Sequence, residues 1–261
     1  MFRDRLLGVP GELATRRALS GYDREGTANL RLTGSEFDMR FRLLMCVVVL
    51  MITSRYVVAA DYAIEPLAEP APADELSEEI AAELSTEGYR VLRKGRAFCD
   101  LWLCKQLPAK KDFTASQTVL YPFQQGALMG VILYHRRGGD FRDQDIDKGV
   151  YTIRYAQQPV DGNHVGTSDT RDFVLLSLAE DDTEAGPVES ETLFERSADA
   201  AQSAHPCMLS LPRTADDATN EAVMLHDEDH DLWSVRLPVV TTTSPEAPLM
   251  MTLVLVGHAE E

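Results

Sequence analysis

The sequence of 261 residues is 44% hydrophobic and 26% charged, which is typical of a globular protein and not of a disordered chain. Its formal net charge of −17 predicts a strongly acidic surface. Such a surface repels phosphate backbones and anionic lipids, so it disfavours nucleic-acid and membrane-surface binding, whereas cation binding or plain solubility fits.

The first 60 residues contain the pattern of an export signal. Residues 39–42, Met-Arg-Phe-Arg, form a short basic segment, and residues 43–52 form an uninterrupted apolar run. The run is shorter than the roughly 18 apolar residues that span a bilayer. Small residues at 58–60 then indicate a cleavage site. We therefore expect a signal peptide at 39–60, an exported protein in the periplasm, at the cell surface or outside the cell, and no stable membrane insertion after cleavage.

Residues 1–38 form a polar N-terminal extension without hydrophobic periodicity, and Met39 is an alternative start of the chain. Residues 1–60 hold 9 Lys/Arg and 6 Asp/Glu. Removing them leaves 25 − 9 = 16 basic and 42 − 6 = 36 acidic residues, a net charge of −20. An odd number of cysteines also remains, so at least one is free or paired between chains: Cys99, Cys104 and Cys207.

Two helices are expected in the remaining chain. Residues 61–73 are rich in proline and alanine and predict an extended linker, so we place a single β-rich domain at 74–261. Residues 73–86 predict an acidic helix with one apolar stripe, formed by Leu76, Ile80 and Leu84. A second helix is expected at 189–204.

Period-two patterns of β-branched and aromatic residues predict that the other elements are strands. They occupy residues 89–93, 96–107, 118–123, 128–135, 149–157, 172–178, 208–211, 222–226, 232–240 and 249–257. Because strands follow one another without alternating helices, the predicted fold class is mainly β: an antiparallel β-sandwich with one N-terminal helix and one inserted helix, with a barrel as the alternative. Within the strand at 96–107, Cys99 and Cys104 should point to opposite faces, so they should share neither a disulfide nor a metal ion.

The most distinctive segment covers residues 149–173 and reads GVYTIRYAQQPVDGNHVGTSDTRDF. A strand leads into a polar loop that contains glycine and His164, and a second strand follows. Together with Tyr121-Pro122-Phe123 and the Leu-Met-Gly-Val of residues 128–131, this segment resembles an uncharacterised family of secreted bacterial proteins. The resemblance covers roughly residues 89–180 and implies export, but it brings no known activity.

The loop within this segment is the predicted ligand-binding surface, because loops at the ends of rigid sheets are where ligands are commonly bound. The candidate ligand-binding residues are Asp161, Asn163, His164, Ser168 and Asp172. His164 is also a candidate general base or metal ligand, with Ser168 as a nucleophile. No nucleophile elbow of the form G-x-S-x-G is present, and Asp-Gly-Asn is equally what a tight turn needs.

Three further segments contain residue types found in metal or phosphate sites. Residues 143–147 alternate aspartates, but the glycine and glutamate that an EF-hand requires are missing, which favours a solvated connection. Residues 136–140, Arg-Arg-Gly-Gly-Asp, lack the spacing of a P-loop and predict a turn. Residues 226–230 lie between two strands, and His226 and His230 with one carboxylate form a candidate surface metal site.

The sequence favours an exported, non-enzymatic binding or structural module. Its expected partner is a small molecule, a metal ion or a cell-surface component, and not nucleic acid; the sequence leaves the cofactor unknown. The alternatives are a metal-dependent or Ser/His hydrolase that uses His164, and a metal-binding protein that uses His226 and His230.

Overall fold

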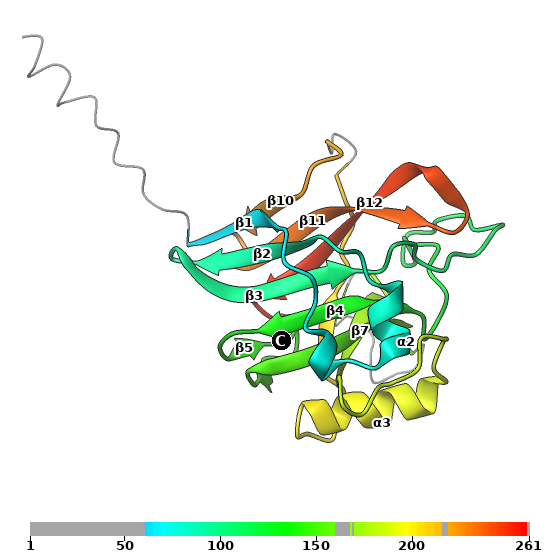
Figure 1. Ribbon diagram of the computed structural model, residues 1–261. Helices are drawn as coiled ribbons and strands as arrows, with labels where there is room; N and C mark the ends of the chain where they lie inside the picture. The colour runs from blue at the N-terminus through cyan, green and yellow to red at the C-terminus, as the bar shows by residue number, and fades with distance from the viewer. Residues whose placement is uncertain (1–60, 160–167, 169, 216–218, 260–261) are drawn as a thin grey trace, which may run out of the picture. The chain divides into compact units, whose positions relative to one another are not determined.

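The computed structural model describes residues 61–159, 168, 170–215 and 219–259 (Figure 1). All of them belong to one unit of the chain, Val58–Glu261. The predicted N-terminal extension and signal peptide lie outside the described residues, and export stays a prediction. Within the described part of the chain, no helix is both long enough and apolar enough to cross a membrane.

The principal sheet has seven strands in the order β1-β2-β3-β4-β7-β8-β9 and curls into a half-barrel (Figure 1). All the ladders between these strands are antiparallel. Two shorter strands, β5 (Gly138–Gly139) and β6 (Asp145–Ile146), form a separate ribbon between β4 and β7 in the chain. The seven strands are β1 (Tyr62–Leu67), β2 (Gly88–Arg93), β3 (Arg96–Leu103), β4 (Leu128–Tyr134), β7 (Gly149–Gln157), β8 (Asp172–Leu178) and β9 (Met208–Ser210).

A second, antiparallel sheet contains β10 (Val223–Asp227), β11 (Leu232–Thr241) and β12 (Ser244–Val256). Alternate residues of β11 and β12 are buried in the same hydrophobic core as the principal sheet: Val235, Leu237, Val239, Met251, Leu253 and Leu255. The hydroxyl of Tyr121 accepts a hydrogen bond from the backbone N–H of Thr252 at 3.1 Å and donates to the carbonyl of Pro212 at 2.8 Å. Apolar burial and these hydrogen bonds therefore join the second sheet to the rest of the domain.

Two α-helices accompany the sheets. The short helix α2 (Glu78–Glu83) begins at Ser77, whose hydroxyl accepts a hydrogen bond from the N–H of Ile80 and caps the helix. The 3₁₀ turn η1 (Ala73–Glu75) precedes it. Helix α3 (Ser190–Ala200) packs on β8 through Leu193, which is fully buried.

The predicted mainly β, antiparallel class with two helices is confirmed. The strands at 149–157 and 172–178 have the predicted bounds. The N-terminal helix is shorter than predicted, because Leu84 already pairs with Cys104 in a β-bridge, although Ile80 and Leu84 are buried as expected.

Two element predictions are wrong. Residues 62–67, expected in a linker, form strand β1, so the folded domain begins before residue 74. Tyr62 and Leu67 are buried, and Pro66 is tolerated because β1 is an edge strand. Residues 118–123 form no strand; only Phe123 makes an isolated bridge, since the N–H of Leu120 donates to a side chain instead.

Candidate binding cleft

The predicted ligand-binding loop is described only in part. Asp161, Asn163 and His164 lie outside the described residues. The hydroxyl of Ser168 accepts a hydrogen bond from the backbone N–H of Thr170 at 3.3 Å. The loop therefore stays a prediction, and the structure places only its C-terminal end.

Asp172, the last of the predicted ligand-binding residues, is fully buried at the start of β8. Its carboxylate accepts hydrogen bonds from the N–H of Leu120 at 2.7 Å and from the hydroxyl of Tyr155 at 2.5 Å. Burial raises the pKa of Asp172, although these hydrogen bonds oppose the shift. We infer that Asp172 holds the segment around Leu120 against β7 and β8, because its oxygens point to the protein and not to solvent.

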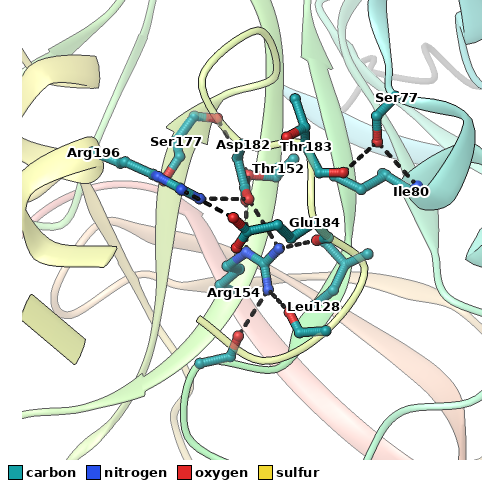
Figure 2. A network of polar contacts seen from close by, with 12 residues as sticks. Ser77, Ile80, Leu128, Thr152, Arg154, Ser177, Asp182, Thr183, Glu184 and Arg196 are labelled. Carbon is teal, nitrogen blue, oxygen red and sulfur yellow. Dashed lines mark hydrogen bonds and ion pairs between the residues drawn. The ribbon is translucent and has the colours of Figure 1, made fainter. Parts of the chain in front are cut away.

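Arg154, in the middle of β7, is also fully buried (Figure 2). Its Nε and Nη2 donate to both carboxylate oxygens of Asp182, at 2.6 and 2.9 Å. Its remaining donors reach the carbonyls of Gly126 at 2.9 Å, Gly186 at 2.8 Å and Glu184. This arginine therefore clamps two loops to the sheet and has no donor left for a ligand.

The carboxylate of Asp182 has two further partners that complete the network shown in Figure 2. The hydroxyl of Thr152 donates to it at 2.5 Å, and Nη1 of Arg196 on α3 donates at 3.1 Å. Because all the hydrogen bonds of this buried carboxylate are formed with groups of the protein, we infer that Asp182 stabilises the fold and does not bind a ligand.

A second buried carboxylate, Asp100 on β3, joins three strands. Arg90 on β2 donates to both of its oxygens at 2.8 and 2.7 Å, and Nε2 of His135, next to β4, lies 2.8 Å from Oδ2. Burial alone would raise the pKa of Asp100, but the hydrogen bonds and positive charges of these neighbours outweigh it, and the pKa falls below its usual value.

His226 and His230 each have their own carboxylate. Nε2 of His226 lies 3.1 Å from Asp231, and its ring stacks on Trp233 with centroids 3.9 Å apart. Nδ1 of His230 lies 2.9 Å from Asp227, and this contact lowers the pKa of Asp227. Among the described residues, no group of three or more His, Cys, Asp or Glu is placed to hold a metal ion.

The described cysteines carry no disulfide. All three are buried and free: Cys99, Cys104 and Cys207. Burial raises the pKa of the Cys104 thiol to about 12, and it raises the pKa of the other two thiols as well. Such thiols are neutral at pH 7 and are poor nucleophiles.

The surface has a cleft of about 640 Å³ at the end of the sheets where β1, β2, the β5–β6 ribbon and the last residue of β12 meet. It brings together three segments whose residue types suggested metal or phosphate sites: the Arg-Arg-Gly-Gly-Asp turn, the alternating aspartates and the His226–His230 turn. Its charged and polar lining side chains are Tyr62, Arg93, Arg137, Asp140, Asp143, Asp145, His230, Asp231 and His258.

One wall of the cleft is fixed by Asp140. Its buried carboxylate accepts hydrogen bonds from the N–H of Arg142 and of Gln144, both at 2.8 Å, and from the N–H of Met208 at 3.1 Å. Gly138 lies against the ring of Tyr134, where an added Cβ would come within 2.7 Å of a ring carbon. The wall is thus a tightly held turn, so its shape exists before any ligand arrives.

Most charges around the cleft are already paired. Arg137 contacts Asp145 at 3.1 Å and Asp147 at 3.6 Å, and His258 lies 3.7 Å from Asp143. The guanidinium of Arg93 instead lies over the ring of Tyr62, 5.6 Å from its centroid. The cleft therefore presents paired charges on one side and a cation on an aromatic ring on the other.

The sequence did not identify the residues that distinguish this cleft. Tyr62 lay in the predicted linker, Arg93 was the last residue of a predicted strand, and His258 follows the last predicted strand. The signals that were available are the aromatic residue two positions after the predicted cleavage site and the three basic residues Arg93, Lys94 and Arg96 in an otherwise acidic chain. Neither signal indicates that these residues meet.

A scan against models of protein families, a search of curated proteins and a search of solved structures each found no match to this chain.

Proposed function

We propose that this protein is an exported, non-enzymatic binding module that holds a small polar molecule in the cleft beside Tyr62 and Arg93. The observation that carries the proposal is the cleft itself, whose volume of about 640 Å³ is within the range of small-molecule sites. Export is supported by the basic, apolar and small-residue pattern of residues 39–60.

The surrounding scaffold supports a binding role. In this proposal the two sheets are the layers of an antiparallel β-sandwich with a shared core, and the cleft lies at one end of them. Its walls are strand ends and short turns, held by the hydrogen bonds of Asp140. Groups on rigid elements lose little entropy when they bind a ligand, which favours affinity.

The chemistry of the lining favours binding over hydrolysis. Among its described residues there is no serine, threonine or cysteine that could act as a nucleophile beside His230 or His258. The imidazole of His230 contacts Asp227, and that of His258 lies near Asp143. The hydrolase alternative through His164 stays a prediction.

The test is an NMR titration of the ¹⁵N-labelled protein with three classes of small molecule: anions such as succinate, cations such as putrescine, and zwitterions such as glutamine. We expect saturable shifts at the amides of Gly138, Gly139 and Gly257, which line the cleft. An absence of saturable shifts with every class would overturn the proposal.

A matched pair of variants checks the location. Gly139→Leu places a side chain in the cleft, where a Cβ meets no atom closer than 3.9 Å, so the backbone should tolerate it. Gly186→Leu is the control, because a Cβ there meets nothing within 4 Å and the residue lies outside the cleft. We expect at least tenfold weaker binding in Gly139→Leu and unchanged binding in Gly186→Leu; equal affinities would contradict the location.

A further inference from the structure

We propose that the ligand of this cleft carries a carboxylate or phosphate group and that the guanidinium of Arg93 binds it. This inference rests on the proposed binding function and names the chemistry that the cleft selects. It starts from the pairing of the charged side chains around the cleft.

The carboxylates around the cleft have cationic or imidazole neighbours in the protein. Arg137 lies beside Asp145, His258 beside Asp143, and His226 beside Asp231. Asp140 is buried and takes its hydrogen bonds from its own turn and from β9. These pairs reduce the net negative charge that an incoming anion meets.

Arg93 differs from them. Among the described residues no carboxylate forms an ion pair with it, and its guanidinium lies over the face of Tyr62. A guanidinium over an aromatic ring keeps its N–H edges in the plane, free to donate two parallel hydrogen bonds to a carboxylate or phosphate. Arg93 therefore has the unused donors of an oxyanion anchor.

Tyr62 holds this anchor in place. Its ring packs on Phe98, with centroids 5.7 Å apart, and on Trp233 at 5.1 Å. Burial raises the pKa of the Tyr62 hydroxyl, while Arg93 opposes the shift, so the ring is neutral at pH 7. A neutral, packed ring under the guanidinium limits its rotation and reduces the entropy lost on binding.

The charge of the lining does not by itself select an anion. The cleft is lined by two arginines, Arg93 and Arg137, and by four aspartates, Asp140, Asp143, Asp145 and Asp231. Because these aspartates and Arg137 have partners within the protein, the guanidinium of Arg93 is the charged group left to bind a ligand. Its paired hydrogen bonds, and not a basic surface, are what favour an oxyanion.

The experiment compares the intact protein with Arg93→Gln in NMR titrations with succinate and with inorganic phosphate. The Gly138 and Gly139 amides line the cleft and report binding there, and the Trp233 indole, which packs on Tyr62, reports a change at that ring. We expect Arg93→Gln to bind either anion at least tenfold more weakly and the intact protein to bind more weakly as salt rises. Arg96→Gln is the matched control, because Arg96 faces Arg93 across the hairpin without lining the cleft.

The outcomes separate this inference from the proposed function. Saturable binding of putrescine or glutamine in the cleft with no response to either anion would overturn the anionic ligand and keep the binding function. Anion binding of equal strength in the intact protein and in Arg93→Gln would overturn the role of Arg93. No binding of any class would refute both. A response to phosphate but not succinate, or the reverse, identifies the oxyanion.

Discussion

Replacing Asp182 by alanine should lower the free energy of unfolding of this domain more than the removal of any surface charge does. The variant would leave the guanidinium of Arg154 fully buried with carbonyl partners but no counter-charge. Removing one member of a buried ion pair costs about 3–5 kcal/mol, because the remaining charge keeps its desolvation penalty and loses its Coulombic compensation. Thr152 and Arg196 would lose their shared acceptor as well, which places the expected cost toward the upper end.

The assay is urea unfolding at pH 7, followed by tryptophan fluorescence and by circular dichroism. Asp145→Ala is the control, because Asp145 forms an exposed ion pair with Arg137 at 3.1 Å, and such pairs contribute about 0–1 kcal/mol. The free energy of unfolding should fall about 3–5 kcal/mol for Asp182→Ala. If the two variants fell within about 1 kcal/mol of each other, the argument that burial makes this pair critical would be refuted.

Three further predictions follow from the same contacts. Asp100→Asn should lower the free energy of unfolding by about 1–3 kcal/mol at pH 7. Because the pKa of Asp100 is lowered in the folded state, its carboxylate stabilises the fold above the unfolded-state pKa, and this stabilisation should shrink as the pH falls below about 4. Urea unfolding of both proteins at pH 7 and pH 3 measures the difference. Gly138→Ala should cost about 1–3 kcal/mol, because its Cβ meets the buried Tyr134 ring at 2.7 Å, whereas Gly139→Ala should change the melting temperature little. In the native state, 5,5′-dithiobis(2-nitrobenzoate) should react with none of the buried thiols at pH 7 and with all of them in urea: Cys99, Cys104 and Cys207.

The strands were predictable where the local pattern is strong. Residues 149–157 combine β-branched and aromatic residues and are buried on both faces, so local propensity and burial agree. Strand β1 was missed because Pro66 and its neighbours have the composition of a linker, and only pairing with β2, more than 20 residues away, makes the segment a strand. Edge pairing of this kind depends on tertiary contacts that composition does not record.

The buried polar groups were predictable in part. An arginine inside Tyr-Thr-Ile-Arg-Tyr-Ala interrupts an apolar strand and implies a buried acidic partner, because a lone buried charge is too costly. The identity of that partner, Asp182, was not predictable, since it comes from a loop 28 residues further along the chain. The cleft could not be predicted for the same reason. Its lining residues are spread along the chain from Tyr62 to His258, and only the order of the strands brings them together.

The contrast between Arg154 and Arg93 explains why the most distinctive segment of the sequence does not contain the candidate anchor. Arg154 lies in that segment. All of its donors form hydrogen bonds with Asp182 and three carbonyls, so this side chain holds loops to the sheet and has no donor left for a ligand. Arg93 lies in an ordinary hairpin, and its guanidinium contacts the face of an aromatic ring. The sequence does not distinguish an arginine whose donors are all used from one whose donors are unused, because it gives the side-chain type and not the hydrogen bonds that the side chain forms. The unused donors are what a ligand can bind, and they are therefore the stronger guide to function in this fold.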